Sequence, residues 1–205
     1  MPQRRELYTL LFSWGEGRGN RVRPEEYPTV LTLLESETPM LALYRENLTS
    51  GAVTEFFIEV TGSAETALPI LYHAERNDVP LSLAFALTWV ESRYSARAVN
   101  ANVGSIDRGL WQLNSLSFRQ LSEEDFFNPE VSSRHGAAYL RRALQLADND
   151  QPTALAIYNA GLARVRRNEI PDSTQRYVRR VREYQRGLEA RFRRYMLKRF
   201  PPASA

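Results

Sequence analysis

Glu91 is the residue of this sequence whose surroundings best suit acid–base chemistry. It is the first acidic residue after Asp78, and the segment between the two is dominated by apolar residues. A carboxyl group that lies against apolar walls has a raised pKa, because burial disfavours its charged form. A raised pKa suits a general acid that works near neutral pH. Composition alone also allows a glutamate at a helix end that simply reaches solvent, so the neighbouring motifs must decide.

Four short blocks occur in a recognisable order, beginning with the pair Glu91-Ser92. Residues 109–114 read Gly-Leu-Trp-Gln-Leu-Asn, residues 156–161 read Ala-Ile-Tyr-Asn-Ala-Gly, and residues 174–178 read Thr-Gln-Arg-Tyr-Val. In this order the blocks resemble those of the soluble lytic transglycosylases, glycoside hydrolase family 23. The resemblance covers more than half of the chain and implies a lysozyme-like fold.

The resemblance implies a peptidoglycan lytic transglycosylase, which cleaves the β-1,4 bond between N-acetylmuramic acid and N-acetylglucosamine. In the family one carboxyl group, here Glu91, protonates the bond while the substrate's own acetamido group assists. The same carboxylate then takes the proton of the sugar's 6-hydroxyl, which leaves a 1,6-anhydro-muramic acid end. The family requires no metal or other cofactor. The residues implied to bind the substrate are Ser92, Gly109, Leu110, Trp111, Gln112, Tyr158, Asn159 and Tyr177.

Individual roles follow from residue type and from the resemblance. Gly109 has no side chain, so we expect its backbone to approach the sugar closely. Trp111 suits either stacking on a sugar or packing in the core, and the sequence does not choose between them. Asn159 suits the substrate's N-acetyl group and Tyr158 the orientation of polar atoms. Tyr177 is expected close to the glutamate.

Asp107 raises an alternative mechanism. The stretch from Asn100 to Ser115 is also similar to c-type lysozymes and to the transglycosylases of secretion systems. In c-type lysozymes the aspartate that matches Asp107 is the second catalytic carboxylate, and two carboxyl groups about 5 to 9 Å apart permit hydrolysis. A lysozyme-type hydrolase that uses Glu91 and Asp107 therefore remains an alternative, although Asp107 also fits a simple turn residue. A non-catalytic wall-binding protein is a further alternative, which the presence of Glu91 opposes.

Apolar periodicity predicts a mainly α fold, a lysozyme-like α+β arrangement with at most a short hairpin near residues 102–114. The segment Leu81 to Ser92 is apolar nearly all round, so we expect a central helix that opens after Pro80. Further helices are predicted over 29–60 (interrupted at Pro39), 63–77, 130–147, 153–159 and 174–196. Residues 1–27 read as irregular. We predict an N-terminal helical extension (1–62), a catalytic domain (63–200) and a tail (201–205).

The C-terminal segment is strongly basic. From residue 164 to residue 199 thirteen arginine and lysine residues stand against four acidic residues, although the whole chain carries a net charge of only +3. This face of the last helix is either simply solvated or meets an anionic wall or membrane surface. Nucleic acid is not favoured as a partner, because the aromatic residues lie on the packing face rather than between the charges.

Composition limits the remaining possibilities. The chain has no cysteine, which excludes disulfides and cysteine ligands. No apolar run approaches the ~20 residues that cross a bilayer. The only apolar stretch near the N-terminus, Leu7 to Phe12, is too short for the core of a signal peptide. Because peptidoglycan lies outside the cytoplasm, we expect a periplasmic or cell-envelope protein whose export signal is not part of this chain.

Overall fold

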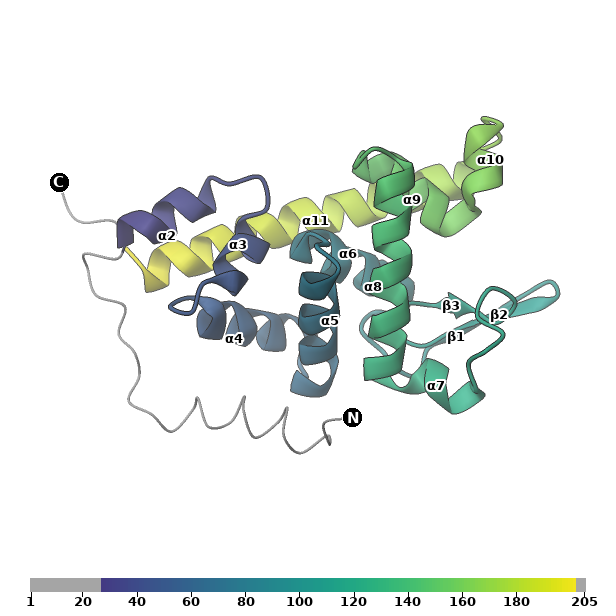
Figure 1. Ribbon diagram of the computed structural model, residues 1–205, viewed down its shortest axis with the longest axis horizontal. Coiled ribbons are helices and arrows are strands. Elements are labelled where there is room, and N and C mark those ends of the chain that lie inside the picture. Colours follow the sequence, from purple (N-terminus) through teal and green to yellow (C-terminus); the bar gives the residue numbers. More distant parts are fainter. Residues whose placement is uncertain (1–26, 202–205) are drawn as a thin grey trace.

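A long C-terminal helix, α11 (Asp172–Arg199), spans most of the length of the molecule and links its two ends (Figure 1). The computed structural model describes residues 27–201. The irregular segment and most of the tail that we predicted at the two termini lie outside the described residues. Along α11, buried side chains recur every three or four residues, which gives the helix one packed face and one basic face.

The central helix predicted from the sequence is confirmed as α6 (Leu81–Ser92). Every residue from Leu81 to Thr88 is buried, as expected for a helix that is apolar all round. Pro80 precedes the first helical residue, and Arg93 ends the helix in the left-handed conformation with φ 54°. Because α6 packs along α11, the two helices fix the position of anything at the C-terminal end of α6.

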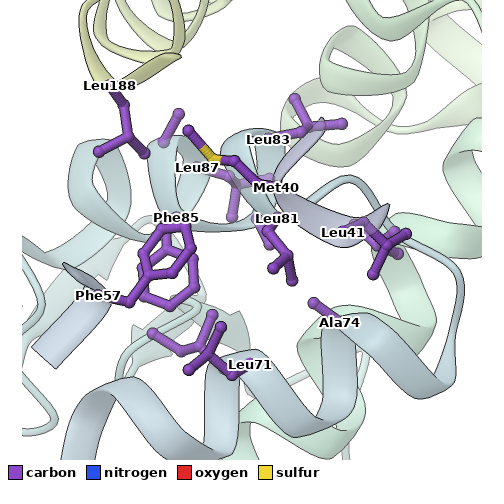
Figure 2. Close-up of a cluster of buried hydrophobic side chains, with 14 of the residues drawn as sticks. Met40, Leu41, Phe57, Leu71, Ala74, Leu81, Leu83, Phe85, Leu87 and Leu188 are labelled. Atoms are coloured by element: carbon purple, nitrogen blue, oxygen red, sulfur yellow. The ribbon is translucent and has the colours of Figure 1, made fainter. Parts of the chain in front are cut away.

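The N-terminal part of the described chain forms a helical layer against α6. The predicted helical stretch over 29–60 is three helices: α2 (Tyr27–Leu34), α3 (Pro39–Arg45) and α4 (Ser50–Thr61). Gly62 adopts φ 71° and ends α4 with a hydrogen bond to the Ile58 carbonyl, as a left-handed cap does. The ring of Phe57 stacks on that of Phe85 in α6 with centroids 3.8 Å apart. Figure 2 shows this pair beside Leu71, Leu87 and Leu188.

A second group of helices continues from α6 towards the other end of the molecule. These helices are α5 (Ala64–Arg76), α8 (Pro129–Leu146) and α9 (Gln151–Ala160). Helix α5 packs on α6, α8 packs on α5, and α9 packs on both α8 and α11. Two short helices, α7 (Glu123–Phe127) and α10 (Leu162–Arg166), are additional to those predicted. Five residues are too few to show a helical period in sequence. A capping box at Ser122 was the one available signal for α7.

A small antiparallel sheet lies at the same end of the molecule as α7 (Figure 1). Its strands, in the order β1-β2-β3, are β1 (Val99–Asn102), β2 (Ser105–Arg108) and β3 (Leu113–Asn114). Asn102 pairs with Ser105 across a tight turn in which Gly104 adopts φ 81°. The hairpin therefore begins three residues earlier than predicted. The mainly α, lysozyme-like fold class is confirmed.

One hydrophobic core runs through the described residues, from Val30 in α2 to Phe200 after α11. Side chains of the predicted N-terminal extension and of the predicted catalytic domain thus contact each other directly. The domain division itself stays a prediction. Within residues 27–201, none of the helices has the length and the apolar character needed to cross a bilayer.

Candidate active site

Glu91 lies in the last turn of α6, half-buried, at the point where this helix meets α11. Its Oε1 accepts a hydrogen bond of 2.7 Å from the Tyr177 hydroxyl. Burial raises the pKa of the Glu91 carboxyl to about 7; the Tyr177 hydrogen bond opposes this rise, the charge of Asp107 adds to it and Arg180 lowers it. Near neutral pH the carboxyl group therefore populates both its protonated and its ionised form.

Tyr177 is itself almost fully buried on the packed face of α11. Burial and the neighbouring Glu91 raise the pKa of the phenol well above its usual value. Because Tyr177 keeps its proton, it donates to the carboxyl in either protonation state. The expectation that Tyr177 lies beside Glu91 agrees with this geometry.

Ser92 connects the end of α6 to the second sequence block. Its Oγ donates to the Leu110 carbonyl at 2.8 Å, across 18 positions of the chain, and lies 3.0 Å from the Thr88 carbonyl. The side chain of Ser92 is buried, as is that of Leu110. The hydrogen bond between the two residues therefore stabilises the backbone around the site. Both side chains are too buried to contact a ligand in this conformation.

Gly109 is required by the packing of the backbone itself. It adopts φ 77°, and a Cβ atom there would overlap the carbonyl oxygen of Phe126. The backbone at Gly109 thus approaches the protein's own backbone closely, and the approach of a sugar to it stays a prediction. Gln112, at φ 47°, donates its Nε2 to the carbonyls of Gly109 at 3.0 Å and Ala98 at 3.1 Å. The amide N–H groups of Gln112 therefore stabilise this turn.

Trp111 packs in the core. Its ring has no exposed surface, and its Nε1 donates to Ser133 Oγ at 3.1 Å. A Cβ atom at Gly136 would overlap the indole, so a glycine in α8 makes the space for this ring. Of the two alternatives for Trp111, core packing is the one realised, and stacking on a sugar is excluded by the burial.

The third block, in α9, brings one polar group to the surface. Tyr158 donates its hydroxyl to the Trp111 carbonyl at 2.9 Å, which ties α9 to the second block. The neighbouring Asn159 is exposed, and its Oδ1 accepts from Thr174 Oγ1 at 2.7 Å. Within residues 27–201 the Nδ2 of Asn159 has no hydrogen-bond partner, so it is free to donate to a ligand.

Asp107 lies in β2, which excludes the simple turn residue that the sequence allowed. Its Oδ2 accepts from Asn102 Nδ2 and its Oδ1 from Asn114 Nδ2, both at 2.7 Å. Two amide donors thus orient the carboxylate. The charge of Asp107 acts on Glu91, so the two carboxyl groups share one electrostatic environment.

The sequence did not reveal the residues that hold the predicted site residues in place. Thr174 and Asn114 lie within segments that resemble the family but were given no role. Thr174 orients Asn159, and Asn114 orients Asp107. Arg180, one turn beyond Tyr177, was expected only as part of the basic face of the last helix. Within the described part of the chain, no group of three or more histidine and acidic side chains could hold a metal ion.

Comparison with known proteins agrees with this geometry. Residues 69–177 match the family described as the Transglycosylase SLT domain, which is more than half of the chain. The protein IpgF of Shigella flexneri is 32% identical over 115 residues, which is 51% of this chain and 76% of IpgF. The chain therefore belongs to the SLT lytic transglycosylase family, and the predicted family membership is confirmed. The matched residues include Glu91, Asn159 and Tyr177.

Proposed function

We propose that this protein cleaves the β-1,4 bond between N-acetylmuramic acid and N-acetylglucosamine in peptidoglycan and leaves 1,6-anhydro-muramic acid ends. The observation that carries the proposal is the half-buried Glu91, whose pKa of about 7 and hydrogen bond from Tyr177 suit an acid that must also act as a base. Family membership supports peptidoglycan as the substrate class.

In the proposed reaction, protonated Glu91 donates its proton to the glycosidic oxygen as the bond from C1 to that oxygen breaks. The oxygen of the substrate's 2-acetamido group attacks C1 and forms a bicyclic intermediate. The Glu91 carboxylate then takes the proton of the 6-hydroxyl, whose oxygen displaces the acetamido oxygen from C1. Glu91 ends protonated and no water is consumed.

The polar groups around Glu91 have matching roles. The free Nδ2 of Asn159 is suited to donate to the acetamido carbonyl and to orient it for attack. Tyr177 keeps the carboxyl of Glu91 in one position through both proton transfers. With a pKa near 7, the Glu91 carboxyl neither loses nor regains its proton at a large cost in free energy at neutral pH. One group can therefore act first as the acid and then as the base.

Asp107 supports a second candidate, a hydrolase of the lysozyme type. Two asparagine amides orient this carboxylate, and its charge reaches Glu91. In such a reaction Asp107 would form a glycosyl-enzyme intermediate or activate a water. The products would then carry reducing ends instead of anhydro ends.

Mass spectrometry of the muropeptides from digested, purified peptidoglycan tests the proposal. We expect products one water lighter than hydrolytic fragments, which mark anhydro ends. Glu91→Gln should reduce the rate by about 10²- to 10⁴-fold, because it removes the proton donor. Asp107→Asn serves as the matched control and should keep the anhydro products. Reducing ends that disappear in Asp107→Asn would favour the hydrolase instead.

We further propose that the protein acts in the periplasm or cell envelope, because its proposed substrate lies there. Peptidoglycan glycan strands are its proposed partner, and nucleic acid is not. The exposed arginines on the basic face of α11 are available for contact with an anionic wall or membrane surface.

A further inference from the structure

The arginines of α11 include two contrasting groups. Towards the C-terminus of the helix, arginines form ion pairs with glutamates of the N-terminal layer. These pairs are Arg191–Glu59 at 2.6 Å, Arg193–Glu35 at 2.6 Å and Arg199–Glu55 at 2.8 Å. In the first half, Arg176, Arg179 and Arg180 are exposed and form no ion pair with any described residue. This first group therefore has positive charge that the chain itself leaves uncompensated.

The three unpaired arginines share one face of the helix, because side chains three and four positions apart are neighbours. Together with Ser173 and Glu183, which are also exposed, they line an open hollow of about 430 Å³ between side chains on the surface of α11. Three positive groups against one negative group favour an anion. Guanidinium groups recognise carboxylates particularly well, since two parallel N–H groups match the two oxygens.

This hollow adjoins the candidate active site. Tyr177 is the residue after Arg176, and its hydroxyl contacts Glu91. Arg180 lies one turn further along α11 and is close enough to act electrostatically on the Glu91 carboxyl. An anion held in the hollow would therefore lie within about one turn of Tyr177 along the helix that contacts Glu91.

We propose that this arginine hollow binds carboxylate groups of the peptide stems that peptidoglycan carries. The proposal rests on the proposed function, because it assigns a subsite to the same substrate. The stem is attached to N-acetylmuramic acid, one of the two sugars at the scissile bond, and it bears free carboxylates. A strand with its muramic acid beside Glu91 thus brings carboxylates to the neighbourhood of Arg176, Arg179 and Arg180.

An anionic membrane surface is the less favoured occupant. A bilayer presents a broad plane of charge, which suits a basic surface spread along the helix. Here the unpaired charge is gathered around a hollow next to Glu91.

The test compares two substrates and two double variants. One substrate is purified glycan strands with intact stems, and the other is the same strands after an amidase has removed the stems. Arg176→Gln/Arg179→Gln removes two charges from the hollow. Arg186→Gln/Arg194→Gln is the matched control, because it removes two exposed charges of the same helix that do not line the hollow.

We expect kcat/KM of the Arg176→Gln/Arg179→Gln variant to fall about three- to tenfold on stem-bearing strands, mainly through KM, as the loss of two exposed ion pairs implies. On stripped strands its kcat/KM should match that of the wild type. The control variant should behave as wild type on both substrates. Arg176→Lys/Arg179→Lys should recover part of the loss, because lysine restores the charge but not the paired N–H geometry.

Three results would overturn the inference alone, and a fourth would overturn it together with the proposed function. Wild-type enzyme that cleaves both substrates equally well would refute the stem subsite while leaving the proposed function intact. Equal losses on both substrates in the Arg176→Gln/Arg179→Gln variant would assign the arginines to glycan binding or to stability. Unchanged digestion together with lost binding to phosphatidylglycerol vesicles would assign them to a membrane surface. If the wild type cleaves neither substrate, the proposed function fails and the inference falls with it.

Discussion

The two halves of α11 have similar composition and different roles. In the first half, Tyr177 contacts Glu91 and the arginines have no acidic partner among the described residues. In the second half, Phe192 packs against Phe56 with ring centroids 5.1 Å apart, and Arg191, Arg193 and Arg199 pair with glutamates of the N-terminal layer. The basic face of one helix is thus two surfaces, and counting charges along the sequence does not separate them.

The largest expected effect lies in the second half of the helix. Phe192 is 1% exposed, and Phe192→Ala should lower the free energy of unfolding by about 3–5 kcal/mol through lost burial and the cavity left behind. Chemical denaturation measures this change. The pH dependence of kcat/KM should stay unchanged where the variant is folded. Arg194→Gln, an exposed neighbour on the same helix, is the control and should unfold as the wild type does. A shifted pH profile in Phe192→Ala would contradict the division of roles.

The second-largest expected effect is a pH-dependent change in the free energy of unfolding. It arises at Glu91, which the first half of α11 contacts through Tyr177. The pKa of Glu91 is about 7 in the folded protein and 4.5 in its ordinary state, so folding favours the protonated form. Its stabilising contribution is therefore complete below pH 4.5 and is lost as the pH rises through 7. Glu91→Gln, which cannot ionise, should be more stable than the wild type by about 1–3 kcal/mol at pH 8 and little changed at pH 4. Thermal or urea unfolding at the two pH values measures this, and an equal effect at both would contradict the raised pKa.

A smaller effect separates two tyrosines of the same half-helix. Tyr177→Phe removes the donor that lowers the pKa of Glu91, so the pH above which kcat/KM declines should move upwards. We expect kcat/KM at neutral pH to fall about tenfold, as the carboxyl loses its fixed position. Tyr184→Phe is the matched control, because its hydroxyl lies 3.3 Å from that of Tyr94. If the pH profile of kcat/KM shifted equally in Tyr177→Phe and Tyr184→Phe, the shift could not be assigned to the hydrogen bond between Tyr177 and Glu91.

The smallest effect concerns the paired arginines. The guanidinium of Arg193 and the carboxylate of Glu35 are 2.6 Å apart, but both side chains are largely exposed. Arg193→Gln should therefore cost at most about 1 kcal/mol of stability, and the difference should shrink in high salt. Denaturation at two salt concentrations measures this. A loss of activity on stripped glycan strands in this variant would contradict its purely structural role.

Two kinds of feature could be predicted from the sequence: helices with a clear local pattern, and site residues that lie in segments resembling the family. Leu81 to Ser92 is apolar on all sides, so the central helix and the glutamate in its last turn were predictable. Tyr177 was found because it stands in a block typical of the family. Membership of that family is confirmed over residues 69–177.

The parts of the site that the sequence could not specify depend on segments distant in the chain. Gly109 is a glycine because the carbonyl of Phe126 lies against it, and no local pattern names that partner. The role of Asp107 depends on the strand register that sets it opposite Asn114. Which arginines of α11 find glutamates depends on which helices lie alongside, which the sequence does not state.

We infer that burial raises the pKa of Glu91 towards neutral pH and that the hydrogen bond from Tyr177 holds the carboxyl in place. Titration of the Glu91 carboxyl by carbon-13 NMR, with Glu91→Gln to assign its signal, tests this directly. We predict a pKa of about 7 in the wild type and a higher value in Tyr177→Phe. A wild-type value near 4.5, unchanged in Tyr177→Phe, would contradict the account.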